Sequence, residues 1–172
     1  DCSAANGEAS APAQPRPPAP DGALDALLGR WVCQSTDAQG LDAFLKDHGV
    51  PYLRRQAAKA AKWPEWEFLL ADGGDGQTGS GSGLIWKNHT MIGILEESVD
   101  VGGPKYATLD GEKNEQMCEA FWEGGALVIE RQSPMGHVRE ERRINERGEL
   151  EFTVRSLEEG KNSTWGRTFR RT

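Results

Sequence analysis

The chain has 172 residues, a length that favours one domain plus some additional chain. Hydrophobic residues make up 37% and charged residues 27% of the sequence, and no apolar run approaches the roughly 20 residues that a membrane-spanning helix needs. The formal net charge of −7 argues against general binding to nucleic acids, because such binding depends on Lys and Arg displacing counterions. The spacing of the three cysteines fits neither a zinc site nor a disulfide framework.

The beginning of the sequence differs in composition from the rest. Residues 1–23 are rich in Ala, Pro, Ser and Gly and include the run Pro-Arg-Pro-Pro-Ala-Pro at 15–20. Such a segment has too little apolar surface to offset the entropy that it would lose on ordering. We therefore expect a disordered or extended N-terminal tail over residues 1–23, followed by one domain over residues 24–172.

The pattern Leu-Gly-x-Trp at 28–31 predicts the first strand of that domain. Trp31 and Cys33 would face one side of this strand, and the residues between them the other. Because Gly29 has no side chain, a neighbouring strand or a bend could approach closely there. Trp31 could then fill one end of an interior.

Two short helices are predicted after this strand. Apolar side chains recur at the spacing of one helix face from Leu41 to His48, and Gly49 would end this helix in a left-handed conformation. The second helix is predicted over residues 52–62, with Pro51 in its first turn, where the missing N–H donor is harmless.

After Glu65 the sequence indicates short strands separated by turn residues. We predict strands over 65–70, 84–86, 91–95, 117–122, 126–131, 138–144, 149–155 and 164–170. Turns are predicted at 72–76, 87–88 and 110–111, and the Gly/Ser-rich run at 78–83 is a poor strand by propensity. Strands at short, even spacing, with helices only near the start, predict an all-β antiparallel barrel with a helical lid.

The order of these motifs resembles the intracellular lipid-binding proteins, the family of fatty-acid-binding and retinoid-binding proteins. The shared pattern comprises Leu-Gly-x-Trp at 28–31, Leu-Asp-Ala-Phe-Leu-Lys at 41–46, Gly-Val at 49–50, Arg-Gln-Ala-Ala at 55–58, Lys-Trp-Pro at 62–64, Trp-Lys-Asn at 86–88, Asp-Gly-Glu-Lys at 110–113 and Trp-Gly-Arg-Thr-Phe at 165–169. The resemblance implies a calycin-type, up-and-down antiparallel β-barrel of about ten strands. A short helix-turn-helix would cap it, and a hydrophobic ligand would lie inside.

The resemblance also implies a site for a ligand carboxylate on the last strand. The family has an Arg-x-Tyr pair there, which corresponds to Arg167 and Phe169, so one hydroxyl donor is absent. Residue alternation supports this position independently, because Trp165, Arg167 and Phe169 share one face of a strand. Two aromatic residues beside an arginine are unusual on a solvated face, although an outward, solvated Arg167 is the alternative.

A second arginine is expected on a nearby strand. Arg139, Arg142 and Arg143 all lie in one stretch, and Arg142 shares its face with apolar residues at both ends of that stretch. We therefore predict that Arg142 points inward. Glu140 lies on the same face and could pair with Arg142, partly neutralising its charge.

The resemblance, together with the shared face of Trp165, Arg167 and Phe169, implies a non-enzymatic carrier of a long-chain fatty acid or a similar amphipathic ligand. Trp86 and Phe44 are further predicted ligand contacts, with ordinary core packing as the alternative. No metal-ligand spacing, catalytic triad or phosphate-binding glycine loop is present, and no cofactor besides the bound ligand is expected.

Partners and compartment follow from the same hypothesis. The stripe Arg55, Lys59 and Lys62 could contact an anionic membrane transiently, or be a solvated helix face. A carrier would be monomeric and cytoplasmic, with a processed organellar or secreted form as the alternative. The rival hypothesis is a structural or interaction subunit that has kept the barrel but lost its ligand, with the N-terminal tail docking on a protein partner.

Overall fold

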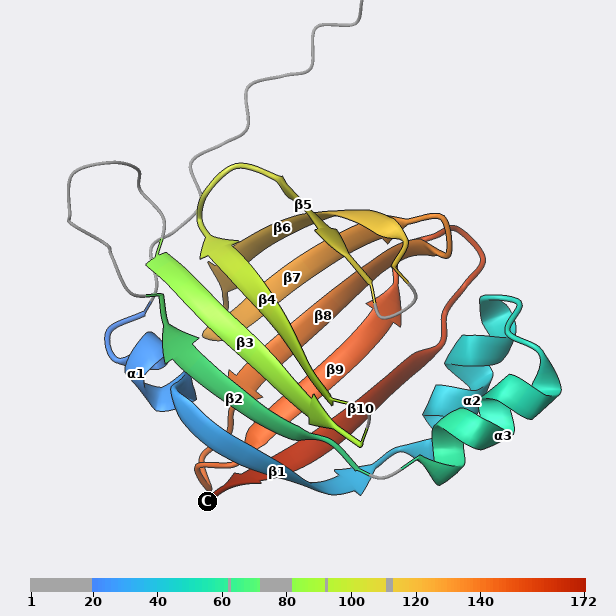
Figure 1. The fold of residues 1–172 in the computed structure, drawn as a ribbon, viewed down its shortest axis with the longest axis horizontal. Helices are drawn as coiled ribbons and strands as arrows, with labels where there is room; N and C mark the ends of the chain where they lie inside the picture. The colour runs from blue at the N-terminus through green and yellow to red at the C-terminus, as the bar shows by residue number, and fades with distance from the viewer. Residues whose placement is uncertain (1–19, 62, 72–81, 92, 111–112) are drawn as a thin grey trace, which may run out of the picture.

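The protein is a β-barrel with helices at both of its ends (Figure 1). The computed structural model describes residues 20–61, 63–71, 82–91, 93–110 and 113–172. The elements are α1 (Ala23–Leu27), β1 (Gly29–Thr36), α2 (Ala38–Asp47), α3 (Tyr52–Ala60), β2 (Glu65–Leu70), β3 (Ser82–Thr90), β4 (Gly93–Val101), β5 (Tyr106–Leu109), β6 (Glu115–Glu123), β7 (Ala126–Ser133), β8 (Gly136–Ile144), β9 (Leu150–Ser156) and β10 (Thr164–Arg171). The predicted tail lies mostly outside the described residues.

The described strands form one sheet in the order β4-β3-β2-β1-β10-β9-β8-β7-β6-β5, and each neighbouring pair in it is antiparallel. The ring closes through one parallel bridge between Val101 of β4 and Ala120 of β6. β5 lies outside that closure, along the edge of β6. The predicted all-β antiparallel barrel with a helical lid is therefore confirmed, with a seam of little backbone pairing between β4 and β6.

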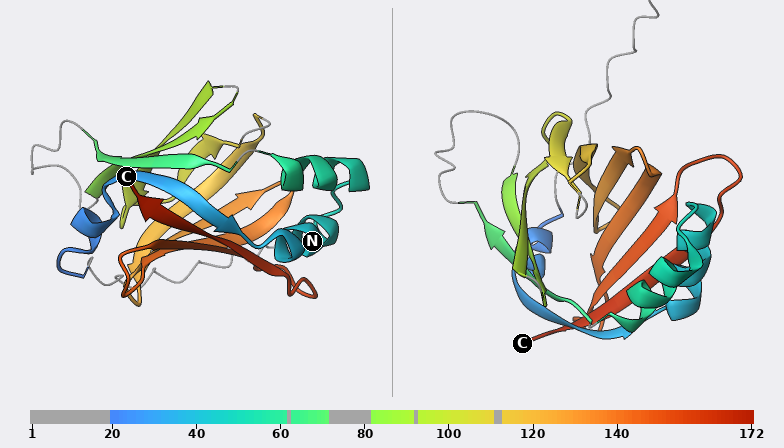
Figure 2. Two further views of the ribbon diagram at one scale, coloured as in Figure 1. Left: turned by 90° about the horizontal axis from the view of Figure 1, so that it is seen from below. Right: turned by 45° about the vertical axis from the view of Figure 1, so that its right-hand side comes forward.

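The lid consists of α2 and α3, which lie together at one end of the barrel (Figure 2). The side chain of Asp37 caps α2 by accepting a hydrogen bond from the backbone N–H of Gly40 at 2.9 Å. Gly49 has a φ of +73°, as the sequence predicted for the end of this helix. α3 ends at Ala60, and residue 62 lies outside the described part of the chain.

The opposite end of the barrel is covered by α1 (Figure 1), a helical turn that the sequence did not predict. Leu27 is buried there, and its carbonyl oxygen accepts a hydrogen bond from the indole of Trp31 at 2.8 Å. Trp31 thus fills this end of the barrel as expected. The expected close approach at Gly29 is wrong, because no atom lies within 4 Å of a Cβ built there. Its φ of +107° is what favours glycine.

The predicted turn at 87–88 is also wrong, since β3 continues through Thr90 and β4 begins at Gly93. Lys87 pairs across the hairpin with Glu96, with 3.3 Å between the charged atoms. Turn-forming residues therefore lie within a strand because a cross-strand partner is available. The predicted turn at 72–76, and residues 78–81 of the Gly/Ser-rich run, lie outside the described residues.

Candidate functional site

The last strand, β10, places a cation between two aromatic side chains on the inner face of the barrel. Phe169 is fully buried and stacks on Trp66, with 4.2 Å between the ring centroids. Trp165 lies under the lid, 6.5 Å from Phe44 of α2 between ring centroids. The guanidinium of Arg167 lies over the Trp165 ring, 5.1 Å from its centroid. The structure thus brings together four residues that the sequence singled out.

Arg167 borders a cavity of about 320 Å³ inside the barrel, here called the lid cavity. The other residues that line it include Phe44, Trp66, Phe152, Val154 and Trp165. Arg167 also borders a cavity of about 620 Å³ near the end of α3, here called the window cavity, whose lining includes Trp63, Asn88, His89 and Met91. Arg167 therefore lies between the interior of the barrel and the space beside the lid.

The charge of Arg167 is not matched by a carboxylate in the part of the chain that the structure describes. Its Nε is buried and has no hydrogen-bond acceptor there. Burial lowers the pKa of Arg167, and the nearby Cys33 opposes this only in part. An anion that entered the lid cavity could supply the missing acceptor through a charge-assisted hydrogen bond.

Arg142 also lies inside the barrel, but it is already bound to a protein carboxylate and borders neither the lid cavity nor the window cavity. It is 2% exposed, and its Nη2 donates to Oε2 of Glu140 at 2.8 Å. Its Cζ lies 5.0 Å from the ring centroid of Phe152, 5.2 Å from that of Trp86 and 5.6 Å from that of Trp66. The inward direction predicted for Arg142 is present, and so is the pairing with Glu140 that the sequence allowed.

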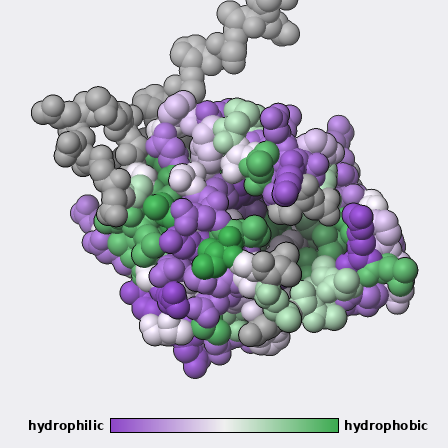
Figure 3. All heavy atoms as spheres, in the orientation of Figure 1, coloured by the Kyte–Doolittle hydropathy of each residue, from purple (hydrophilic) through white to green (hydrophobic). Residues whose placement is uncertain are grey.

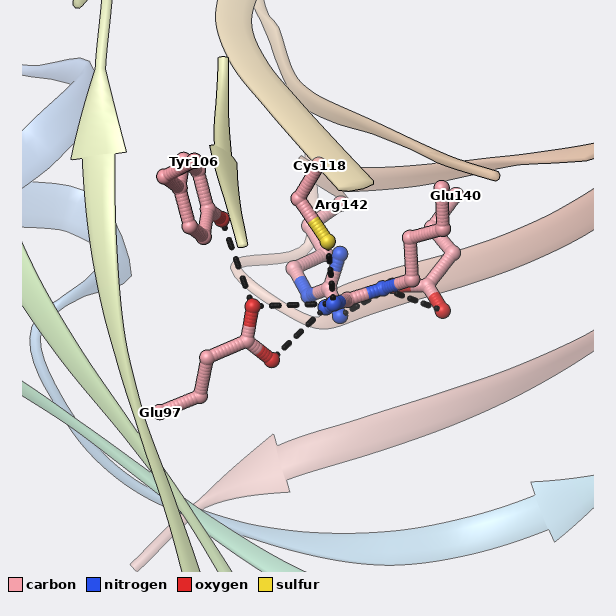
Figure 4. A network of polar contacts seen from close by, with 6 residues as sticks. Glu97, Tyr106, Cys118, Glu140 and Arg142 are labelled. Atoms are coloured by element: carbon pink, nitrogen blue, oxygen red, sulfur yellow. Dashed lines mark hydrogen bonds and ion pairs between the residues drawn. The ribbon is translucent and has the colours of Figure 1, made fainter. Parts of the chain in front are cut away.

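Glu140 links Arg142 to a network of buried charges that crosses the barrel (Figure 4). Its Oε1 lies 3.1 Å from Nε of Arg131 on β7. The Nη1 and Nη2 of Arg131 donate to the two carboxylate oxygens of Glu97 on β4, at 2.8 and 2.9 Å. This bidentate ion pair spans the seam beside the β4–β6 bridge and adds side-chain bonding where backbone pairing is sparse.

The network is electrically balanced, with two guanidinium groups and two carboxylates. Burial tends to raise the pKa of Glu140, but Arg131 and Arg142 outweigh it, and the pKa lies below its usual value. Burial likewise tends to lower the pKa of Arg131, but Glu140 and Glu97 outweigh it. Glu140 and Arg131 are therefore held in their charged forms by their neighbours.

Two neutral groups complete this network (Figure 4). The Tyr106 hydroxyl donates to Glu97 at 3.2 Å, and burial raises the pKa of Tyr106 far above its usual value. The Cys118 sulfur accepts from Arg131 at 3.2 Å, and burial raises the pKa of its thiol to about 11, although Arg131 opposes the rise. Both side chains add hydrogen bonds without adding charge.

Trp86 borders a third cavity, of about 470 Å³, here called the seam cavity. The other residues that line it include Asn88, Leu95, Glu97 and Leu109. It adjoins the lid cavity, because both are lined by Asp110, Gln116, Arg131 and Glu140. Leu95 and Leu109 are about half exposed. Figure 3 shows a hollow near the middle of the face that it draws.

The other two arginines of the predicted stretch do not enter the barrel. Arg139 pairs on the outer surface with Glu130 and Glu141, at 3.4 and 2.8 Å. Arg143 donates to the backbone oxygen of Gly124 at 2.6 Å. Strand alternation therefore separates Arg142 from its neighbours as expected.

The predicted basic stripe on α3 faces α2 in part. Arg55 lies 3.3 Å from Asp42, and Lys59 lies 3.9 Å from the same carboxylate. Lys62 lies outside the described residues. Two of the three cations therefore help to hold the helices together.

Sequence reasoning missed Arg131 and Glu97, which carry half of the buried charges in the network. A signal for Arg131 was available, because it shares its strand face with Leu127 and Ile129. Glu97 had no such signal, since β4 was predicted to be much shorter. Its role depends on a partner 34 residues away in the chain.

Within the described ranges no three His, Cys, Asp or Glu side chains lie close enough together to hold a metal ion. None of the described helices has the length and apolarity needed to cross a membrane.

No protein-family model and no curated protein sequence matches the chain significantly. Solved structures do match it. Fatty-acid-binding protein 1 of Echinococcus granulosus is 20% identical, with 86% of this chain and 98% of that chain covered and a TM-score of 0.67. The Schistosoma mansoni fatty-acid-binding protein in complex with arachidonic acid is 16% identical, with 88% and 99% covered and a TM-score of 0.68.

The zebrafish ileal bile acid-binding protein complexed with cholic acid is 18% identical, with 86% and 99% covered and a TM-score of 0.64. These identities are low, but the alignments span nearly the whole of each solved structure. Together with the strand order and the lid, they show that the chain has the fold of the intracellular lipid-binding proteins.

Proposed function

We propose that this protein binds and carries a long-chain fatty acid or a similar amphipathic acid inside the barrel, without enzymatic activity. The acid group would lie at Arg167, and the apolar part would lie in the lid and seam cavities. The observation that carries this proposal is the largely buried guanidinium of Arg167, which has no carboxylate partner among the described residues and lies at the boundary of a hollow interior.

The surroundings of Arg167 suit an acid with an apolar chain. Phe44, Trp66 and Phe152 provide apolar walls, and each methylene buried there would contribute roughly 0.8 kcal/mol. Volumes of about 320 and 470 Å³ fall in the range usual for small-molecule sites. Burial of the chain would therefore supply most of the affinity, and Arg167 would fix the orientation.

The role proposed for Arg142 differs from the one that the resemblance implied. Because Glu140 already binds its guanidinium, a ligand carboxylate there would have to compete with a protein carboxylate. We therefore assign the acid group to Arg167 alone and treat Phe169, Trp165, Trp86 and Phe44 as apolar contacts.

The test is displacement of a fluorescent fatty acid by hexadecanoic acid and by hexadecanol, which share a chain but differ in charge. We expect the wild type to prefer the acid, and Arg167→Gln to lower the affinity for the acid by about tenfold or more while affecting the alcohol little. Arg170→Gln is the matched control, since Arg170 is on the outer face of the same strand and pairs with Glu149.

Equal affinity for the acid in wild type and Arg167→Gln would remove Arg167 from the site. If neither probe bound with saturation, the carrier proposal itself would be wrong. The rival function, a structural subunit without ligand, would then gain support, since two of the three inward arginines are already paired with protein carboxylates. Native mass spectrometry would separate a bound lipid from a stoichiometric protein partner.

A carrier of this kind would be monomeric and cytoplasmic, and its lid would meet an anionic membrane during ligand transfer. Because Arg55 and Lys59 lie beside Asp42, this contact would depend less on them than the sequence alone suggests. Vesicle flotation with and without anionic lipid would measure it.

A further inference from the structure

We infer that the ligand carries, besides its acid group, an uncharged oxygen that accepts hydrogen bonds from the indoles of Trp66 and Trp86, beside Arg142 deep in the barrel. The ligand class would then be an oxygenated amphipathic acid, such as a hydroxy or oxo fatty acid. This inference rests on the proposed function. The three residues are called the donor cluster below.

The donor cluster is compact. The rings of Trp66 and Trp86 lie nearly perpendicular, with 5.4 Å between centroids, and the Arg142 guanidinium lies within 5.6 Å of both. The side chains come from β2, β3 and β8, so they meet across the interior rather than along one strand. Three side chains that carry N–H groups thus lie next to one another.

Four donor nitrogen atoms of the donor cluster make no hydrogen bond within the described part of the protein. The indole nitrogens of Trp66 and Trp86 and the Nε and Nη1 of Arg142 are buried and have no acceptor there. A buried donor without an acceptor is unfavourable, because it has given up its hydrogen bonds to water without replacing them. Four of them in one place are therefore best explained by a group that enters the barrel with acceptor atoms.

Two members of the donor cluster lie at the walls of the space that the ligand would occupy. Trp66 borders the lid cavity, which also contains Arg167, and Trp86 borders the adjoining seam cavity. Arg142 lies beside both rings but borders a separate cavity of about 340 Å³, together with Leu27 and Trp122. A single molecule could therefore reach Arg167 with one group and the indoles of Trp66 and Trp86 with another.

The local charge selects an uncharged acceptor over a second acid. Glu140 and Glu97 already balance Arg142 and Arg131, so a further anion would face two carboxylates without a free cation. A hydroxyl fits best, because it could accept from an indole N–H and donate to the Glu140 carboxylate. A carbonyl could use only the first of these interactions.

The test compares hexadecanoic acid with its mid-chain hydroxy and ω-hydroxy derivatives. The measured quantity is the affinity for each hydroxy acid relative to the parent acid. We expect this ratio to fall by roughly three- to tenfold for at least one derivative when Trp66→Phe and Trp86→Phe are combined. These changes remove both indole N–H groups but keep aromatic rings, and any loss of apolar contact that both acids share cancels in the ratio.

Trp165→Phe is the matched control, because its indole N–H is also buried without an acceptor but lies beside Arg167. It should leave the ratio unchanged. A ratio that is the same in the wild type and the double variant for both derivatives would overturn the inference while leaving a fatty-acid carrier intact. If the wild type bound none of the acids, the proposed function would fail first.

A second measurement covers the case in which the double variant does not fold. In the ¹⁵N-labelled wild type, the indole N–H resonances of Trp66 and Trp86 should move downfield more with a hydroxy acid than with the parent acid. The Trp165 resonance should respond equally to both. Equal shifts at Trp66 and Trp86 for every acid would mean that only water meets these donors, and would contradict the inference.

Discussion

Two arginines, Arg142 and Arg167, point into the same barrel, and both have Phe152 of β9 as their cross-strand backbone neighbour. Their surroundings nevertheless differ. Arg142 is 2% exposed, is enclosed by three aromatic rings and is bound by Glu140. Arg167 borders two cavities, stacks on one ring and has no carboxylate partner among the described residues. The same residue type thus has a structural role in one place and is available to a ligand in the other.

The difference shows how a barrel can contain several arginines in its interior without binding anions at each of them. Paired charges on Glu97, Arg131, Glu140 and Arg142 stabilise one another and the seam, because removing either partner of a buried pair leaves the other unsatisfied. A charge without a carboxylate partner, such as that of Arg167, gains a stabilising ion pair only when an anion binds. The stability of the fold and the binding of an acid therefore depend on different arginines.

The largest expected effect is a loss of stability when the carboxylate of Glu140, which Arg131 and Arg142 share, is removed. Glu140→Gln leaves Arg142 without a carboxylate partner among the described residues and Arg131 with Glu97 alone, so we expect the free energy of unfolding to fall by about 3–5 kcal/mol. Urea denaturation of the ligand-free protein measures it. Glu141→Gln, at the next position on the outer face, should cost no more than about 1 kcal/mol. Similar losses in both variants would show that the inner network has no special weight.

The contribution of Glu140 should also depend on pH. Its pKa in the folded protein is below the ordinary value of 4.5, so the stabilisation is fully present above about pH 4.5 and is lost as the pH falls through the folded-state pKa. The difference in unfolding free energy between wild type and Glu140→Gln should be constant near neutral pH and narrow in acid. Urea titrations from neutral to acidic pH would follow it. A gap that widened on acidification would mean that the carboxylate is protonated in the native state.

The smallest effect is expected at Arg167. Arg167→Leu removes an unpaired, desolvated charge and one contact with the Trp165 ring, so the unfolding free energy without ligand should change by no more than about 1 kcal/mol. With a fatty acid added, the wild type should gain more thermal stability than the variant. A loss of 3 kcal/mol or more without ligand would assign Arg167 a structural role like that of Arg142.

The sequence by itself determined the barrel, the lid and the inward direction of Arg142 and Arg167, because these depend on local periodicity. Alternation on β10 and β8 assigned Trp165, Arg167 and Arg142 to the inner face, and helical spacing predicted α2. Gly49 likewise ended its helix as expected. Each of these features is decided within a few residues of chain.

The tertiary structure alone decided which of the inward arginines has no carboxylate partner among the described residues. Whether a guanidinium has a carboxylate partner depends on strands far apart in the sequence, as with Glu97 and Arg131 across the seam. Nor could local pattern foresee that Lys87 and Asn88 would lie within β3, where cross-strand neighbours replace a turn. Pairing of buried charges is a property of the closed barrel, because only closure brings these side chains together and excludes water from them.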